Sequence, residues 1–178
     1  MNHMNNEILK KNIRVVPDFP IAGIQFQDVS TLFGNAECLR IMRDETVSLY
    51  KDKGVTKVVG LESRGFMLGT VIAADLDAGF VMARKPNKLP GATVSVSYDK
   101  EYGKDTICMV SDAISENDVV LIHDDLLATG GSMRAAIELV KKFKPKKIYV
   151  NFIIELTIEG LHGRDALGDV EITTLMTV

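Results

Sequence analysis

The sequence has 178 residues, of which 46% are hydrophobic and 25% charged, and these values exclude a collagen-like, disordered or disulfide-dense protein. The formal net charge of -3 provides no overall positive field for a polyanion, so we expect no nucleic-acid partner. Cys38 and Cys108 lack the spacing of a metal or redox site, and residues 1–12 contain no apolar stretch long enough for a signal peptide or membrane span. We therefore expect one cytoplasmic domain over residues 1–178, without a membrane partner.

Short apolar runs alternate with helix-period stretches along the chain. This pattern is typical of strands joined by crossover helices, and it predicts an α/β fold with helices flanking a mostly parallel, twisted sheet. After an entry punctuated by Pro and Gly, a helix is predicted from a cap at Asn35 to about Gly54. Its predicted inner face carries Leu39, Met42, Val47 and Tyr50.

The next segments predict a strand, a tight loop, a helix and a second strand. Lys57–Leu61 is the first buried strand, Glu62–Arg64 the loop, Gly65–Ala74 the helix and Phe80–Ala83 the second strand. Such a unit places the loop at the carboxyl end of its first strand.

Two segments rich in β-branched residues, Thr93–Ser97 and Thr106–Val110, predict a hairpin. The polar stretch between them, residues 98–105, is predicted to form a mobile tip, and tips of this kind often close over ligands. The remaining predicted elements are the strand Val119–His123, the helix Ser132–Lys142 and the strand Ile148–Ile154.

Asp124 and Asp125 directly follow the predicted strand Val119–His123. In a parallel sheet, ligands collect beyond the carboxyl ends of the strands, so this acidic pair is expected at the mouth of a binding crevice. Carboxylates at that place can accept hydrogen bonds from two neighbouring hydroxyl groups. The alternative is that the two acids cap a helix.

A loop of small residues follows the acidic pair and leads into the next helix. Its two glycines allow consecutive N–H groups to turn toward an anion at the helix N-terminus, where hydroxyl side chains add further donors. No Lys follows the glycines, which excludes a P-loop, and the G-x-G-x-x-G pattern is absent. A phosphate beside a diol predicts a phosphorylated ribose, although the glycines alone are also compatible with a simple turn. The predicted phosphate contacts are Ala128, Thr129, Gly130, Gly131 and Ser132.

This loop, DDLLATGG in one-letter code, resembles the phosphoribosyl pyrophosphate (PRPP) signature of the type I phosphoribosyltransferase family, in particular its adenine-specific members. The resemblance covers nearly the full chain. It implies the type I fold, with an N-terminal hood over residues 1–34 and a flexible catalytic loop at residues 98–105. It also implies that a homodimer converts adenine and PRPP to AMP and pyrophosphate with Mg²⁺, as a step of purine salvage. Further matching segments are Val16–Pro20, Leu61–Phe66, Arg84–Pro86, Lys88–Gly91, Ser97–Tyr98, Glu101–Gly103 and Glu155–Leu156.

The same resemblance assigns roles to individual residues. Glu101 corresponds to the loop glutamate proposed to handle the proton on the purine, and an ordinary exposed acid is the alternative. Glu62-Ser63 corresponds to the start of the pyrophosphate loop, where a cis peptide is expected. Mg²⁺ is expected mainly through PRPP, with Asp124 or Asp125 as candidate protein ligands. The implied catalytic residues are Glu101, Arg64, Asp124 and Asp125, and the implied diphosphate contacts are Ser63, Arg64, Arg84, Lys85 and Lys88, unless the cations form a solvated patch.

The implied base contacts include one departure from the family. Gln27 stands where members usually carry Arg, so the charge and the bidentate fork of that side chain are lost. Transfer to another purine therefore stays open, as does a non-catalytic PRPP sensor, although the acidic chain lacks a basic DNA-reading element. His123 stands where an apolar residue is usual in the family. It is interpreted either as a buried structural histidine or as a catalytic one. The implied base contacts are Gln25, Phe26, Gln27 and Leu126.

Overall fold

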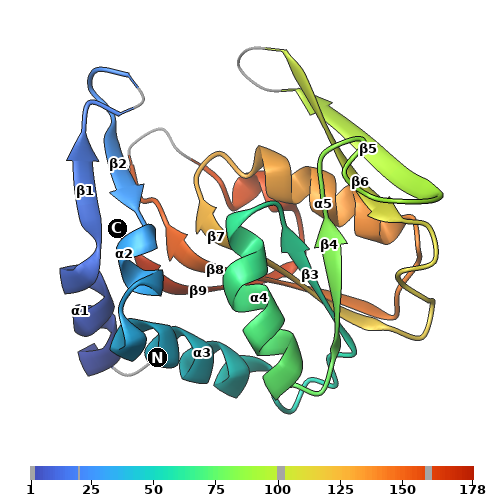
Figure 1. The fold of residues 1–178 in the computed structure, drawn as a ribbon, viewed down its shortest axis with the longest axis horizontal. Coiled ribbons are helices and arrows are strands. Elements are labelled where there is room, and N and C mark those ends of the chain that lie inside the picture. The colour runs from blue at the N-terminus through green and yellow to red at the C-terminus, as the bar shows by residue number, and fades with distance from the viewer. Residues whose placement is uncertain (1–2, 20, 100–102, 159–161) are drawn as a thin grey trace.

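A parallel sheet of five strands forms the centre of the molecule, in the order β4-β3-β7-β8-β9 (Figure 1). Every neighbouring pair in this sheet is parallel, which confirms the predicted α/β class. The computed structural model describes residues 3–19, 21–99, 103–158 and 162–178. The strands of the sheet are β3 (Lys57–Leu61), β4 (Gly79–Ala83), β7 (Val119–Leu127), β8 (Lys147–Glu155) and β9 (Glu171–Thr177).

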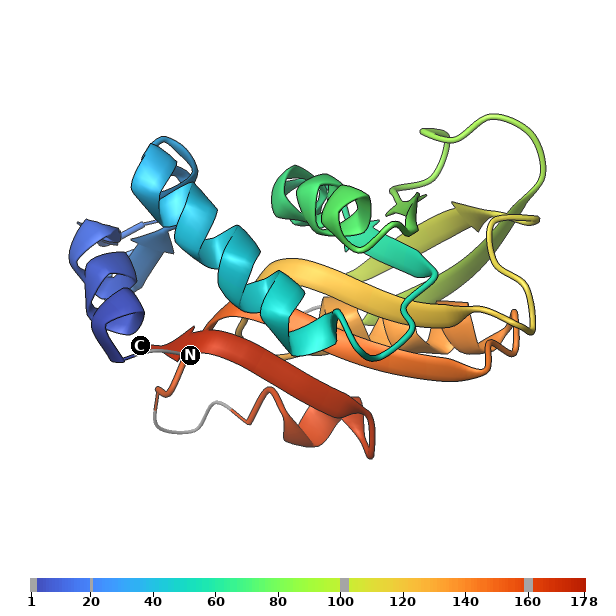
Figure 2. The ribbon, with the colours of Figure 1, turned by 90° about the horizontal axis from the view of Figure 1, so that it is seen from below.

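Helices cover both faces of the sheet (Figure 2). Alternate strand residues supply two hydrophobic cores: Val58 and Leu121 pack toward α3 and α4, whereas Val59 and Ile122 pack toward α5. This is the pattern expected for strands that are buried on both faces. In the described part of the chain, no helix is long and apolar enough to cross a membrane. The helices are α1 (His3–Asn12), α2 (Ser30–Phe33), α3 (Ala36–Tyr50), α4 (Arg64–Asp75), α5 (Gly131–Lys141) and the 3-10 helix η1 (Asp165–Leu167).

The predicted cap of α3 is confirmed, and its predicted inner face is confirmed at Met42 and Tyr50 but not at Leu39 and Val47. Asn35 Oδ1 accepts hydrogen bonds from the N–H groups of residues 37 and 38, at 2.9 and 3.2 Å. A cap of this kind stabilises a helix by about 1 kcal/mol. Leu39 and Val47 are only half-buried, because the helix docks along a row of residues spaced four apart. The buried row is Cys38, Met42, Thr46 and Tyr50.

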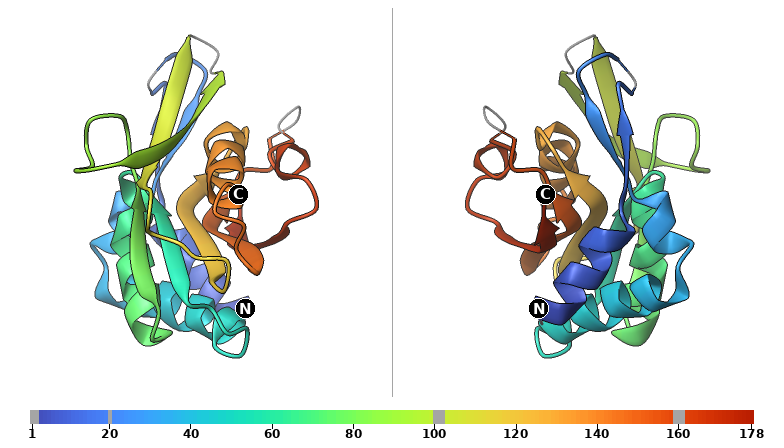
Figure 3. Two further views of the ribbon diagram at one scale, coloured as in Figure 1. Left: turned by 90° about the vertical axis from the view of Figure 1, so that its right-hand side faces the viewer. Right: turned by 90° about the vertical axis from the view of Figure 1, so that its left-hand side faces the viewer.

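Two hairpins extend above the carboxyl edge of the sheet (Figures 1 and 3). The first pairs β1 (Arg14–Pro17) with β2 (Gln25–Asp28), and the second pairs β5 (Thr93–Asp99) with β6 (Lys104–Val110); both are antiparallel. The prediction of a mobile tip from residue 98 is wrong in extent. Tyr98 is buried in the core that contains α5. The ladder between β5 and β6 includes Tyr98 and Asp105 and continues to the pair Asp99 and Lys104.

Strand β7 is also longer than predicted, because β8 pairs with it as far as Leu127. Asp124 and Asp125 therefore belong to the end of the strand and not to the loop after it. The elements without a counterpart among the predicted ones are α1, β1, β2, α2, η1 and β9. Strands β3 and β7 are neighbours, and the sheet continues from them in opposite directions, to β4 and to β8. Such a switch in strand order opens a crevice outside the carboxyl ends of the two strands.

Candidate active site

Three segments at the carboxyl edge of the sheet bring together most of the predicted phosphate-binding residues. They follow β3, β4 and β7, and they surround two cavities of about 350 Å³ and 190 Å³. The cavities adjoin, since four residues line both of them: Arg64, Asp124, Asp125 and Ser132. The larger cavity is also lined by Leu61, Glu62, Ser63, Ala83, Arg84, Lys85, Tyr98 and Ile107. The smaller one is also lined by residues 126–131, Met133 and Phe152.

The loop after β3 places a cation between the two cavities. The peptide bond between Glu62 and Ser63 is cis, as the resemblance implies. Arg64 begins α4, and its Nε donates to Oδ2 of Asp125, whose side chain is 4% exposed. The Arg64 side chain is about half exposed, and its two terminal nitrogens remain as donors for a ligand.

The loop after β4 carries two further cations beside the same cavity. Arg84 donates to both carboxylate oxygens of Glu62, at 2.9 and 3.3 Å, and the backbone N–H of Lys85 donates to Glu62 at 2.9 Å. These hydrogen bonds lower the pKa of Glu62 below its usual value. Lys88 is exposed and reaches this cluster through its carbonyl oxygen, which accepts from Arg84 at 3.1 Å. Arg84 and Lys85 are therefore held at the site by hydrogen bonds, and the charge of the Lys88 ammonium also contributes to the lowered pKa of Glu62.

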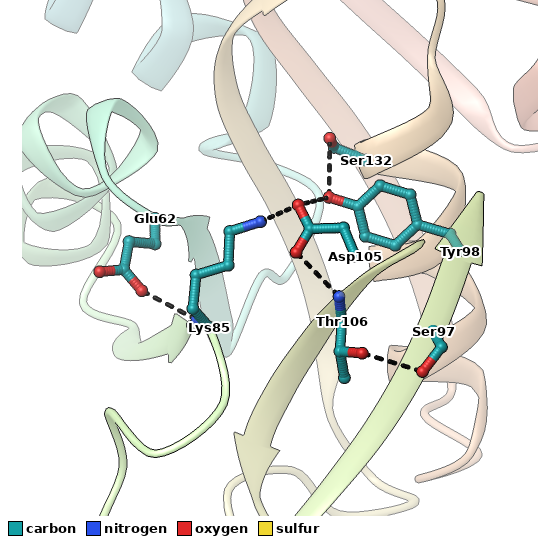
Figure 4. A network of polar contacts seen from close by, with 7 residues as sticks. All are labelled: Glu62, Lys85, Ser97, Tyr98, Asp105, Thr106 and Ser132. Atoms are coloured by element: carbon teal, nitrogen blue, oxygen red, sulfur yellow. Dashed lines mark hydrogen bonds and ion pairs between the residues drawn. The ribbon is translucent and has the colours of Figure 1, made fainter. Parts of the chain in front are cut away.

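The hairpin β5–β6 contributes two side chains to the site that the sequence did not single out (Figure 4). Lys85 Nζ donates to Asp105 Oδ2, and the Tyr98 hydroxyl lies 3.2 Å from both Asp105 Oδ2 and Ser132 Oγ. Tyr98 belongs to a segment that matches the family and Asp105 to the predicted tip, but the sequence alone assigns neither side chain a role. The alternation of Tyr98 with Val96 in a β-branched strand was the available signal.

The loop after β7 surrounds the smaller cavity and ends at the start of α5. Gly130 has φ +79°, and a Cβ at this position would lie 2.5 Å from the carbonyl oxygen of Gly163. Only glycine therefore fits, both for its backbone conformation and for the close approach of the second loop. The helix N-terminus at Gly131 directs unpaired N–H groups and the positive end of the helix dipole toward the cavity. The glycine conformation and the helix N-terminus expected from the sequence are therefore both present in this loop.

The acidic pair lies where the two cavities meet. Asp125 is buried, and its N–H donates to Asp124 Oδ1 at 2.9 Å. Burial raises the pKa of Asp124 well above its usual value, and the adjacent Asp125 carboxylate raises it further. A close contact with α4 contributes to this burial, since a Cβ on Gly65 would lie 3.2 Å from Asp124 Oδ1. Bringing in positive charge would favour the ionised form of this carboxyl group.

His123 is fully buried beneath the site in a row of polar side chains that crosses the sheet. Its Nδ1 lies 2.8 Å from Asn151 Oδ1, Asn151 donates to Thr173 at 2.9 Å, and Thr173 contacts the Tyr50 hydroxyl at 2.7 Å. Burial lowers the pKa of His123 from 6.5 to about 4. His123 is therefore a neutral structural histidine, and neither cavity is lined by it.

The predicted base contacts are not brought together with the phosphate residues, with the exception of Leu126. Gln25, Phe26 and Gln27 lie on β2, in the separate two-stranded sheet, and none of them lines either cavity. Phe26 is half-buried and packs edge-on against Phe19, with 5.1 Å between the ring centres. The Gln27 side chain donates to the carbonyl oxygen of Gln25 at 3.3 Å. Glu101 lies outside the described residues.

The protein groups near the cavities do not by themselves form a metal cage. Among the described residues, no group of three or more His, Cys, Asp or Glu side chains could hold a metal ion. Asp125 is already paired with Arg64, and the raised pKa of Asp124 disfavours a bare carboxylate there. This donor set fits Mg²⁺ that is held mainly by ligand phosphates, with one protein carboxylate at most.

Comparison with known proteins identifies the family. The phosphoribosyl transferase domain family matches residues 30–165. An adenine phosphoribosyltransferase of Phocaeicola vulgatus is 59% identical over 176 residues, which cover 98% of this chain and 100% of that protein. The chain belongs to the adenine phosphoribosyltransferase family. The Rhodothermus marinus member, whose crystal structure is known, is 47% identical in sequence to this chain. The two structures match with a TM-score of 0.91 over 99% of this chain and 100% of that one. The Giardia lamblia member, solved with 9-deazaadenine, is 40% identical, with a TM-score of 0.89 over 96% of each chain. The type I phosphoribosyltransferase fold expected from the sequence is thereby confirmed.

Proposed function

We propose that this protein transfers the phosphoribosyl group of PRPP to adenine and releases AMP and pyrophosphate, which is a reaction of purine salvage. The observation that carries the proposal is the pair of adjoining cavities at the switch point of the sheet. One is lined by cations and the other by a helix N-terminus, with two acids between them. PRPP has the matching order of groups: a diphosphate, a ribose diol and a 5-phosphate. The adenine-specific family of the chain supports adenine as the acceptor.

The diphosphate end would lie in the larger cavity, against Ser63, Arg64, Arg84 and Lys85. Cleavage at the anomeric carbon develops positive charge on the ribose and negative charge on the departing pyrophosphate. The cations would stabilise the negative charge on the departing pyrophosphate. Arg64 can do this through its terminal nitrogens while its Nε stays bonded to Asp125. Lys88 is a further candidate contact of the diphosphate, since the charge of its ammonium also acts on Glu62 in this cluster.

The ribose 5-phosphate end would lie over the loop after β7. N–H groups of Gly130, Gly131 and Ser132 and the hydroxyls of Thr129 and Ser132 are the donors for the 5-phosphate, with Ala128 shaping the loop. The acidic pair would accept hydrogen bonds from the two ribose hydroxyl groups. The pKa of Asp124 is raised in the protein alone, and the positive charge that develops on the ribose would favour the ionised carboxylate, which is the form that accepts these hydrogen bonds.

Mg²⁺ would arrive with the diphosphate of PRPP, with Asp124 or Asp125 as its candidate protein ligand. The ion, when bound, neutralises phosphate charge and so assists the departure of pyrophosphate. Glu101, which lies between β5 and β6 in the sequence, is proposed to manage the proton on the purine. Such a group contributes typically about 10²- to 10⁴-fold to a rate.

The base would be held by Gln25, Phe26, Gln27 and Leu126, beneath a hood formed by residues 1–34. Leu126 supports this placement, because it lines the smaller cavity. Gln27 motivates a second candidate function, transfer to another purine, since Gln lacks the charged fork usual at this position.

We also propose a homodimer, which the family resemblance supports. The two free, buried cysteines, Cys38 and Cys108, support a reducing cytoplasm.

One assay distinguishes these functions. The protein is incubated with PRPP, Mg²⁺ and, in turn, adenine, hypoxanthine, guanine or xanthine, and nucleotide formation is followed. We expect AMP as the preferred product. Preferential turnover of another purine would refute the adenine assignment, and no product with any base would refute phosphoribosyl transfer. Light scattering of the same sample measures the oligomeric state.

A further inference from the structure

The carboxylate of Asp105 contacts donors from both phosphate-binding parts of the site (Figure 4). Its Oδ2 accepts from the Lys85 ammonium and, at 3.2 Å, from the Tyr98 hydroxyl. The Tyr98 oxygen in turn lies 3.2 Å from Ser132 Oγ. One chain of polar contacts therefore joins the loop after β4 to the first turn of α5.

Asp105 is itself held in a fixed position. Its Oδ1 accepts the N–H of Thr106 at 2.9 Å, and the residue is paired with Tyr98 across the hairpin. The Asp105 side chain is 17% exposed. The Tyr98 ring is buried in the core that contains α5. The carboxylate therefore acts as an anchor that is built into the hairpin, whereas the exposed ion pairs of a surface are mobile.

Lys85 keeps donors for a ligand while it contacts this anchor. An ammonium has three N–H groups, and the contact with Asp105 uses one of them. Lys85 remains 42% exposed and lines the larger cavity. Its four-carbon stem is flexible, so without a partner the ammonium would spread over many positions in solvent. Arg64 follows the same pattern, since Asp125 holds its Nε and its outer nitrogens stay available.

We propose that Asp105 is a positioning residue for both ends of PRPP. It directs the Lys85 ammonium toward the diphosphate and, through the Tyr98 hydroxyl, holds Ser132 Oγ at the mouth of the 5-phosphate loop. This role rests on the proposed function, because it takes PRPP as the ligand of both cavities. Asp105 acts through its neighbours and touches no reacting atom.

The two ends of PRPP can be tested separately with pyrophosphate and with ribose 5-phosphate, each titrated calorimetrically in the presence of Mg²⁺. Asp105→Asn is expected to weaken pyrophosphate binding about tenfold, the usual size of a lost charge-assisted hydrogen bond, and to weaken ribose 5-phosphate binding as well. Tyr98→Phe keeps the contact between Lys85 and Asp105, so it is expected to weaken ribose 5-phosphate binding more than pyrophosphate binding. Ser97→Ala is the matched control. It removes an exposed hydrogen bond of 2.9 Å to Thr106 in the same hairpin and should leave both affinities unchanged.

Unchanged or tighter pyrophosphate binding in Asp105→Asn would overturn the positioning role. Equal weakening of both ligands in Tyr98→Phe would also overturn it, because that result indicates a general distortion of the hairpin. If Asp105→Asn does not fold, Tyr98→Phe decides by whether its affinity for ribose 5-phosphate falls. A wild-type protein that binds neither ligand refutes the PRPP site itself. Wild-type binding without AMP formation refutes only the transfer to adenine.

Discussion

Replacing His123 by Asn should remove a specific part of the acid sensitivity of the fold. In the folded protein the imidazole is fully buried, with a pKa of about 4 in place of 6.5. As the pH falls below 6.5, His123 binds a proton in the unfolded chain but stays neutral in the folded chain. The free energy of unfolding therefore falls progressively down to about pH 4. A difference of about 2.5 pH units at 1.36 kcal/mol each corresponds to about 3 kcal/mol.

We expect the free energy of unfolding of the wild type to fall by about 3 kcal/mol more than that of His123→Asn between pH 6.5 and pH 4. Asn keeps an N–H donor near Nδ1, so Asn151 retains its partner. The pKa of Asp124 is raised, so its contribution to the free energy of unfolding rises as the pH falls, opposite to that of His123. Because Asp124 is present in both proteins, this contribution cancels in the difference between them. Urea titrations at a series of pH values provide the measurement. His162→Asn, which removes an exposed histidine, is the control. Parallel pH profiles for wild type and His123→Asn would refute the reasoning.

Four further changes test the site. Gly130→Ala places a Cβ 2.5 Å from the Gly163 carbonyl oxygen, so the KM for PRPP should rise more than about tenfold. Gly54→Ala is its control, with similarly positive φ and no neighbour within 4 Å. Gln27→Arg should lower the KM for adenine about tenfold by restoring a charged fork. Glu101→Gln should lower kcat about 100-fold or more with little change in the KM for PRPP. Removal of Mg²⁺ with EDTA should abolish AMP formation, and added Mg²⁺ should restore it. Steady-state kinetics measures all four.

Each of these expectations has a result that contradicts it. Equal KM values for the two glycine variants would mean that the contact with the second loop is unimportant for PRPP. A higher KM for adenine in Gln27→Arg would remove this residue from the base site. Undiminished turnover in Glu101→Gln would exclude that side chain from proton transfer. Full activity in EDTA would exclude a metal requirement.

The central sheet was predictable because its strands are short apolar runs bounded by polar or glycine residues. Lys57–Leu61 was predicted with its observed limits, and β4, β7 and β8 within a few residues, whereas the edge strand β9 was not predicted. β1 and β2 were not predicted, because polar and exposed residues such as Arg14 and Gln25 give no periodic pattern of burial. The end of β7 was missed for a different reason. Its last residues are strand only because β8 lies beside them, and such pairing is not visible in a local window.

For the site, the sequence indicated the phosphate-binding residues but not how they are held. Arg64 and Asp125 are far apart in the chain, as are Lys85 and Asp105, so their contacts depend on the arrangement of the sheet. The role of Gly130 shows the same limit. Its positive φ was predictable from the loop pattern, whereas the approach of Gly163 depends on the tertiary fold.

The first hairpin has a consequence for how such proteins can diversify. Gln25, Phe26 and Gln27 belong to a two-stranded sheet that shares no ladder with the five-stranded one in the described part of the chain. The residues proposed to select the base therefore occupy a structural unit apart from those proposed to bind PRPP. Mutations can accumulate in this hairpin without disturbing the packing that orients Asp124, Asp125 and the loop after them. Natural selection can thus alter the acceptor while the sugar-phosphate chemistry is inherited unchanged, and Gln27 stands at a position where such a change would begin.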